Sequence, residues 1–199
     1  MHIVIDGVFN HCSWYFPQFS DVVEKGESSE YANWFYRLQF PVIRPATEEE
    51  KPTYSCFAYE RKMPKLNSSN PEERAYFMEV CRYWIREFKV DGWRLDVANE
   101  VDRGFWRDFH RAAHEENPES VMIGEIWESS ETWLNGDMFD STMNYDFRKN
   151  CRDFFALRKI SAEEFHDRIV KMLLRYRTGT LRGQLNLLDS HDVNRFLSY

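Results

Sequence analysis

The sequence lacks several features that would assign it at once to a familiar class. None of its apolar runs approaches the length that a bilayer-spanning helix requires. Its 4 cysteines include no Cys-x-x-Cys pair, and the chain has no internal repeat beyond a β/α unit and no low-complexity segment. Positive charge is not in excess, because the net charge is −7. These absences argue against a membrane span and against a nucleic-acid or anionic-membrane surface as the main partner.

The cysteines and the N-terminus bear on where the protein lies in the cell. Cys81 falls on an apolar helical stripe, and reduced core thiols are the interpretation that the cysteine spacing favours. We therefore expect a cytoplasmic protein. No signal sequence precedes the first strand, which follows Met1 almost at once. A natural domain usually begins with an approach segment, so we also expect this chain to be part of a longer protein.

Apolar and aromatic residues are plentiful. Of the 199 residues, 43% are hydrophobic and 17% aromatic, which is enough for one sizeable core. Flat aromatic faces pack cores, and they also stack on sugar rings. Together with the acidic charge, this composition fits a soluble enzyme that acts on a neutral substrate.

Short β-rich runs alternate with helical patterns along the chain. We expect strands at residues 2–9, 92–97, 121–126, 141–143 and 184–188. The intervening patterns predict helices over about 71–88, 103–116 and 146–158, and a further helix from Ser161. This alternation predicts an α/β fold with a parallel sheet. Five strands cannot close a small barrel, so two sheet edges would be open and would favour self-association.

Two of these helices have clear capping signals. Asn70 precedes Pro71 and is followed three residues on by Glu73, and Ser161 is followed by Glu164, so both sites predict a capping box. Apolar residues then recur at helical spacing, which predicts one buried stripe for each helix. The expected stripes are Phe77, Cys81, Trp84, Ile85 and Phe88, and Phe165, Ile169, Met172, Leu173 and Tyr176. The helix near 103–116 has Phe105, Phe109, Ala112 and Ala113 on one side.

Residues 12–69 show no clear period and are rich in aromatics and proline. A connection of this length is uncommon as a plain loop, so we interpret it as a small inserted subdomain. The remaining residues, 1–11 and 70–199, would form the main α/β unit.

Four apolar runs each end in an acidic residue or in an acidic residue with a polar partner. This recurrence is the strongest indication of function. The runs lie in residues 3–11, 90–96, 121–125 and 185–192. Burying a lone carboxylate is costly, so acids at the ends of successive strands indicate one shared polar site. The carboxyl ends of parallel strands are where α/β enzymes carry out their chemistry.

Asp96 and Glu125 are the two acids with the most informative neighbours. Arg94 lies two residues before Asp96 on a strand, so both side chains face the same way, and a guanidinium keeps a neighbouring carboxylate ionised and oriented. Glu125 lies among Ile123, Ile126 and Trp127, where desolvation would keep it protonated. Glycoside hydrolysis needs such a pair. A structural ion pair and a strand-end contact remain the alternatives.

Histidines beside the acids leave a metal site open as another interpretation. Asp6, His11, His191 and Asp192 are all ligand types, although no His-x-x-His spacing supports them. The same groups also hydrogen-bond sugar hydroxyls.

The four segments resemble the characteristic regions of the α-amylase superfamily, glycoside hydrolase family 13, and they occur in the family order. The matching stretches are residues 6–11, 92–100, 124–127 and 188–192. A fifth stretch, residues 63–67, resembles the neopullulanase, cyclomaltodextrinase and maltogenic amylase group, as do 34–36 and 40–42. The resemblance implies a partial (β/α)8 barrel, from about its third to its seventh strand. Residues 12–69 would then be a domain B-like insertion.

The resemblance also implies a role for each matching residue. Asp96 would be the nucleophile, Glu125 the general acid/base, and Asp192 the stabiliser of the transition state. Arg94 would orient Asp96, His11 and His191 would hydrogen-bond the sugar, and Asn99 and Glu100 would lie toward the subsites beyond the scissile bond. Trp127 joins the expected substrate-binding residues. The implied reaction is retaining hydrolysis of α-1,4 glucosidic bonds, with α-1,6 bonds and transfer to another sugar left open.

No cofactor is expected, and calcium is left open as an optional ion with Asn10 as a candidate ligand on family grounds. The expected partner is an α-glucan oligosaccharide such as a maltooligosaccharide, a cyclodextrin or pullulan. Two alternatives stay open: a non-catalytic glycan-binding remnant of an amylase-type barrel, and an α-glucosidase or glycosyl-transferring relative. We expect the 199-residue chain alone to be weakly active or inactive.

Overall fold

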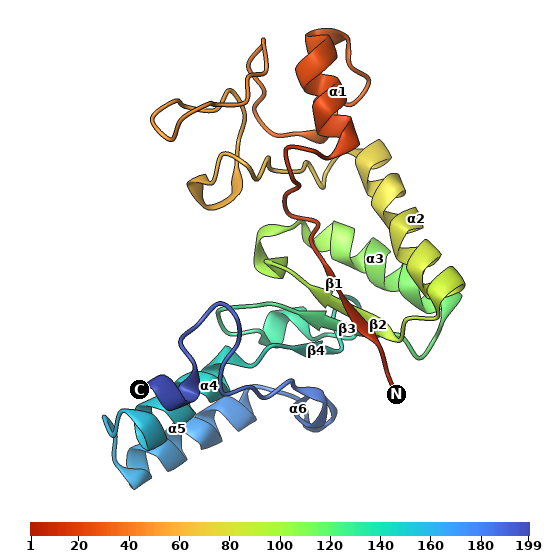
Figure 1. Ribbon diagram of the computed structural model, residues 1–199. Helices are drawn as coiled ribbons and strands as arrows, with labels where there is room; N and C mark the ends of the chain where they lie inside the picture. The colour runs from red at the N-terminus through yellow and green to blue at the C-terminus, as the bar shows by residue number, and fades with distance from the viewer.

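The computed structural model describes residues 1–199 and is built around one parallel sheet (Figure 1). Its strands are β1 (Val4–Gly7), β2 (Gly92–Leu95), β3 (Val121–Gly124) and β4 (Ser141–Thr142), in the order β1-β2-β3-β4. Every neighbouring pair is parallel. The parallel sheet predicted from the β/α alternation is therefore confirmed.

The register of the sheet aligns the ends of its strands. Leu95 lies opposite Gly7 and Gly124, so Asp96 and Glu125 leave the sheet at the same edge. Gly92 permits the close pairing at the other end, because a Cβ there would lie 2.1 Å from the Val121 carbonyl oxygen. Any larger residue at this position would push β2 and β3 apart.

Two helices cover one face of the sheet. These are α2 (Pro71–Phe88) and α3 (Arg103–Glu116), which run side by side in Figure 1. Phe9 packs between them and the sheet, with ring centroids 4.9 Å from Phe109 and 5.2 Å from Phe77. The predicted buried side of the 103–116 helix is confirmed, because Phe105, Phe109, Ala112 and Ala113 are all fully buried.

The predicted stripe of the first helix is only partly right. Phe77, Cys81 and Ile85 are buried, but Trp84 and Phe88 are 37% and 55% exposed. These two rings pack against each other at a tilt of 35°, with centroids 4.7 Å apart. Periodicity identifies the apolar face, but it does not show how much of that face the rest of the chain reaches.

The prediction of two capping boxes is also only partly right. The Asn70 side chain accepts the backbone N–H groups of Glu72 and Glu73, as predicted, but neither Glu73 carboxyl oxygen has a hydrogen-bond partner. Ser161 likewise caps its helix at Glu164, whereas the Glu164 carboxylate pairs with Arg168 instead of closing a capping box. Both N-caps are confirmed, and both reciprocal contacts are wrong.

The C-terminal third is helical. It contains α4 (Tyr145–Cys151), a π-helical turn (Arg152–Ala156), α5 (Ala162–Leu174) and α6 (Thr178–Gly183). The predicted helix at 146–158 corresponds to α4 and the π-helical turn, and α6 was not predicted. Of the expected stripe on α5 only Met172 is buried, and Leu173 is 42% exposed.

The predicted strand at 184–188 is wrong. Leu185 makes a single parallel bridge to Met143, with hydrogen bonds from its N–H to Thr142 and from the Asn144 N–H to its carbonyl. Because β4 has only two residues, it offers the following segment too short a template for a ladder. The sheet therefore has four strands and not five.

Residues 12–69 lie apart from the sheet in Figure 1, in red to gold, and contain α1 (Pro17–Lys25). An isolated antiparallel bridge from His11 to Lys65 ties the two ends of this segment together, and a bridge from Phe35 to Leu66 connects its middle to its C-terminal end. Phe19 and Val22 of α1 are fully buried within it. The division into an inserted subdomain and a main unit remains our interpretation.

Short 3-10 turns complete the structure. They cover Gly26–Ser28, Ala32–Trp34, Phe57–Tyr59, Ala98–Glu100, Glu131–Trp133 and Phe196–Ser198. All four cysteines are free thiols. None of the helices combines the length and the apolar character needed to cross a membrane.

Candidate active site

Asp96 and Glu125 begin immediately beyond the ends of β2 and β3. The Asp96 N–H donates to the Gly7 carbonyl at 2.9 Å, and the Glu125 N–H donates to the Leu95 carbonyl at 2.9 Å. The hydrogen-bonded ladder thus extends one residue past each strand. These backbone hydrogen bonds fix the main chain of both acids independently of their side-chain contacts.

Arg94 joins three carboxyl groups at this edge of the sheet. Its Nη1 lies 2.7 Å from Asp96 Oδ1 and 2.8 Å from Asp6 Oδ1, and its Nη2 lies 3.0 Å from Glu125 Oε1. The Arg94–Glu125 contact is an ion pair by distance, although the N–H is not aimed at the oxygen. The predicted orientation of Arg94 beside Asp96 is found, and the contacts to Asp6 and Glu125 were not anticipated.

Glu125 is buried, with 2% of its surface exposed. Burial raises its pKa above the ordinary value, and the Val97 N–H and Arg94 offset part of this rise. Val97 donates that N–H to Glu125 Oε2 at 2.9 Å from a left-handed backbone conformation, with φ at 43°. A β-branched residue rarely adopts this conformation, so local backbone strain accompanies the hydrogen bond to the carboxyl group.

Asp192 approaches from the other end of the sequence. Asp192 has fewer contacts than Asp96 and Glu125. Its N–H donates to Ser190 Oγ at 3.3 Å, and its Oδ2 lies 3.2 Å from His191 Nε2. The side chains of His191 and Asp192 are 70% and 38% exposed. This wall of the site is therefore a loop, whereas the opposite wall is built on strands.

One cavity of about 570 Å³ brings the three acids together. Seven predicted site residues line it: His11, Asp96, Asn99, Glu100, Glu125, Trp127 and Asp192. Val8, Phe57, Met63 and Val97 complete its lining. Arg94 lies behind the acids that it contacts, and His191 lies beside Asp192 on the exposed loop. The cavity is large enough for a sugar unit and combines acidic groups with flat rings.

Aromatic rings flank the acids on two sides. His11 stacks on Phe57 with ring centroids 4.7 Å apart, and burial lowers the pKa of His11, which favours the neutral imidazole. Trp127 stacks on Tyr145 at 4.0 Å, and the Tyr145 hydroxyl lies 3.3 Å from Ser190 Oγ. The sequence interpretation missed Tyr145, although it follows β4 closely, as the predicted acids follow their strands.

Asn99 and Glu100 lie on the 3-10 turn that follows Asp96. Glu100 Oε2 pairs with Lys65 Nζ at 2.6 Å, which connects this turn to the inserted segment. The Asn99 Oδ1 atom is buried and has no hydrogen-bond partner. This wall of the cavity therefore retains an unused hydrogen-bond acceptor.

The alternative metal site made of Asp6, His11, His191 and Asp192 does not assemble. Asp6 is bonded to Arg94, His191 pairs with Asp192, and the only three such side chains close enough to share an ion lie elsewhere, on α3 and before β4. Asn10 is 1% exposed and its Oδ1 has no partner, which suits one ligand of a hard cation. Calcium takes about six to eight oxygens, so Asn10 alone does not define a calcium site.

The sequence of the whole chain is similar to those of known proteins. The family model "Alpha amylase, catalytic domain" matches residues 1–199. A cyclomaltodextrinase of Thermoanaerobacter pseudethanolicus is 45% identical over 98% of this chain and 34% of its own length. An intracellular maltogenic amylase of Bacillus subtilis is 44% identical over 100% of this chain and 32% of its own length. Other relatives at similar identity are named maltogenic alpha-amylase and neopullulanase.

The fold agrees with that of solved enzymes. The ligand-free cyclic α-maltosyl-(1→6)-maltose hydrolase of Arthrobacter globiformis superposes with a TM-score of 0.93 at 38% identity, covering 100% of this chain and 44% of that one. The chain spans about a third of the length of the curated relatives that it matches. The predicted partial (β/α)8 barrel is confirmed, and the chain belongs to the α-amylase catalytic-domain family of glycoside hydrolases.

Proposed function

We propose that this chain carries the catalytic groups of a retaining glycoside hydrolase that cleaves α-glucosidic bonds of maltooligosaccharides, cyclodextrins or pullulan. The single observation that carries this proposal is the meeting of Asp96, Glu125 and Asp192 around one cavity. The three residues lie far apart along the chain, and no packing requirement explains their convergence. The substrate class comes from relatives that are named for their action on cyclodextrins and pullulan.

Asp96 is the proposed nucleophile. Arg94 Nη1 holds its Oδ1 at 2.7 Å, which orients the carboxyl group and leaves Oδ2 for attack on the anomeric carbon. The attack forms a covalent glycosyl–enzyme bond as the glycosidic bond breaks. Because Arg94 contacts Asp96 and Glu125 at once, the two carboxyl groups are close neighbours, as retaining enzymes require.

Glu125 is the proposed general acid/base. Its raised pKa keeps a proton available for the departing glycosidic oxygen. After that transfer the ionised Glu125 takes a proton from water, and the resulting hydroxyl group displaces Asp96 and releases the sugar. Asp192 supplies negative charge to the positively charged transition state from the loop side of the cavity.

The remaining predicted residues are proposed to hold the substrate. His11 and His191 hydrogen-bond hydroxyl groups near Asp96 and Asp192, while Asn99 and Glu100 lie beside the proposed nucleophile, toward further sugar units. Trp127 offers a half-exposed ring, 48% accessible, on which a pyranose face can stack. We propose no cofactor for this chemistry, and leave calcium at Asn10 as an optional structural ion.

The cytoplasm is the proposed location, because the cysteines are free and one relative is named an intracellular maltogenic amylase. Self-association through the sheet edges also stays a proposal. Ile3 and Val4, at the edge formed by β1, are 44% and 43% exposed. A sedimentation experiment that finds a stable monomer would contradict it.

Activity of the protein that the gene encodes tests the catalytic proposal. We expect release of reducing sugar from β-cyclodextrin or pullulan, and a loss of roughly 10⁴-fold or more in Asp96→Asn. Equal rates in the parent and in Asp96→Asn would refute the assignment of the nucleophile. Binding of maltotriose by calorimetry, without turnover by the parent, would instead identify a non-catalytic glycan-binding protein. Product analysis by chromatography separates hydrolysis from transfer to another sugar.

A further inference from the structure

A second polar cluster lies away from the cavity, on the outer face of α3. His110 and His114 are four residues apart and therefore project from the same side of the helix. Their rings stack with centroids 4.0 Å apart. Neither histidine contacts a residue of the candidate active site.

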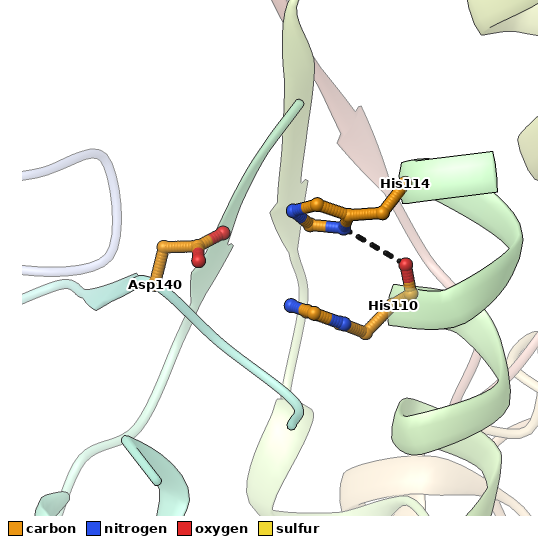
Figure 2. Close-up of side chains that lie close together, drawn as sticks. All are labelled: His110, His114 and Asp140. Atoms are coloured by element: carbon orange, nitrogen blue, oxygen red, sulfur yellow. Dashed lines mark hydrogen bonds between the residues drawn. The ribbon is translucent and has the colours of Figure 1, made fainter. Parts of the chain in front are cut away.

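Asp140 faces the two rings from the segment that leads into β4 (Figure 2). Its Oδ2 accepts the Met122 N–H at 2.8 Å, and its own N–H donates to the Met122 carbonyl at 3.0 Å. Strand β3 thus fixes both the backbone and the carboxylate of Asp140. One ligand atom each of His110, His114 and Asp140 lies within 4.8 Å of the other two.

The hydrogen bonding of His114 defines its tautomer. Its Nδ1–H donates to the His110 carbonyl at 2.9 Å, since a carbonyl only accepts. The neutral ring therefore carries its lone pair on Nε2, and this nitrogen points toward Asp140 in Figure 2. A backbone carbonyl in this position is the outer partner that metal-binding histidines commonly have.

A polar groove beside the cluster offers a further ligand. The groove has a volume of about 510 Å³, and its lining includes His110, His114 and Asp137. Asp137 Oδ2 pairs with Arg107 Nε at 2.6 Å, whereas its Oδ1 is buried and has no partner. The groove therefore has room for water or a fourth oxygen ligand next to the imidazoles.

We propose that His110, His114 and Asp140 form a binding site for a divalent transition metal, with zinc as the best match. Two imidazoles and a carboxylate suit zinc and its neighbours in the first row, whereas calcium and magnesium prefer oxygen ligands alone. Bonds of about 2.0–2.1 Å need only a small inward movement of side chains that already face one another.

The site is structural in this proposal. The ion would join α3 to the residue before β4, and so add to the Arg107–Asp137 pair that already links α3 to this segment. Met122 lies in the middle of β3, whereas Glu125 follows the end of that strand, so the ion would lie away from the reacting bond. We expect metal binding to raise thermal stability and to leave turnover unchanged.

Metal titration of the tag-free protein, after dialysis against a chelator, tests the proposal. We expect one Zn²⁺ per chain by calorimetry and an increase in Tm on zinc addition. Binding should weaken at least about 10-fold in His114→Gln and in Asp140→Asn. His166→Gln is the matched control, because His166 is an exposed helical histidine outside the cluster. Zinc binding that persists unchanged in the double variant His110→Gln/His114→Gln would overturn the proposal.

NMR of the wild-type protein gives an independent readout, in which the variants serve only to assign the signals. The chain has 6 histidines, and zinc should shift the ring NMR signals of two of them. Assignment through His114→Gln and His166→Gln identifies which signals move. Shifts confined to His11 and His191, or no shift and no heat of binding, would exclude a metal site on α3.

Discussion

Glu125 and Glu73 are both buried carboxyl groups, but they lie in different surroundings. Glu125, at the end of β3, is 2% exposed, and Glu73, in the first turn of α2, is 0% exposed. Burial is the largest cause of a raised pKa in both, and it raises the pKa of Glu73 to about 8. Burial alone therefore does not distinguish a catalytic acid from a structural one.

The partners of the two acids differ. Glu125 is held by the Val97 N–H and by Arg94, and it lines the cavity that also contains Asp96. Glu73 has no hydrogen-bond partner for either oxygen and does not line the cavity that contains Asp96. A buried acid becomes useful for catalysis when fixed donors orient it and an opening exposes it to substrate.

Of the changes that compare the two buried acids, Glu125→Gln should have the largest effect. Removing the general acid should lower kcat/KM by roughly 10²–10⁴-fold. Glu73→Gln, the matched change at the other buried acid, should leave kcat/KM within a few fold, because Glu73 does not reach the cavity. The measurement is release of reducing sugar from β-cyclodextrin by each variant. An equal loss in both variants would show that Glu125 acts through stability alone.

The pH profile sharpens this prediction. A general acid works only while it is protonated, so activity should fall as pH rises through the raised pKa of Glu125. In Glu125→Gln the residual activity should no longer show this alkaline fall. A profile with the same alkaline limb in both proteins would assign that limb to a different group.

Much of this site was predictable because its acids follow the carboxyl ends of parallel strands. Parallel pairing brings the residues after Gly7, Leu95 and Gly124 to one edge, so motifs on separate strands are placed together by the fold. What sequence did not reveal is which side chains share a partner. Arg94 was expected beside Asp96, but its contact with Glu125 depends on the spacing of β2 and β3.

Features that depend on neighbouring elements were harder to predict. The strand expected at 184–188 is absent because β4 is too short to support it. Trp84 and Phe88 repeat at helical spacing like core residues, yet the described chain leaves them partly exposed. The pair His110 and His114 has the i,i+4 spacing of a metal site, but it was overlooked because Asp140 joins it only in three dimensions.

The next largest effect is expected for Arg94→Met, and it concerns stability. The substitution leaves Asp6, Asp96 and Glu125 together without their cation, so unfolding free energy at pH 7 should fall by about 3 kcal/mol. Urea unfolding followed by circular dichroism measures this. Arg82→Met is the control, because the Arg82–Glu115 pair is more exposed and should contribute little. The Arg94→Met loss should shrink as pH falls through the raised pKa of Glu125, because the protonated carboxyl group no longer needs a cation.

Glu73→Gln should act on stability in the opposite direction. The folded pKa of Glu73 is about 8 and its ordinary value is 4.5, so the folded chain holds this proton more tightly than the unfolded chain between these values. Its contribution to unfolding free energy therefore falls as pH rises through that window. Glu73→Gln should stabilise the protein by about 2 kcal/mol at pH 8 and have little effect at pH 4. An unchanged pH dependence of urea unfolding would indicate that Glu73 ionises freely.

The smallest effect is expected at the cap that precedes Glu73. Asn70 accepts the N–H groups of Glu72 and Glu73 at 2.9 and 3.0 Å, so Asn70→Ala should cost about 1 kcal/mol of unfolding free energy. Asn70→Asp retains the acceptor and should recover most of the loss. Because the cap bonds only backbone groups, the pH window assigned to Glu73 should persist in Asn70→Ala. If that window disappears, then the first turn of α2, and not burial of the side chain, governs the acid at this end of the molecule.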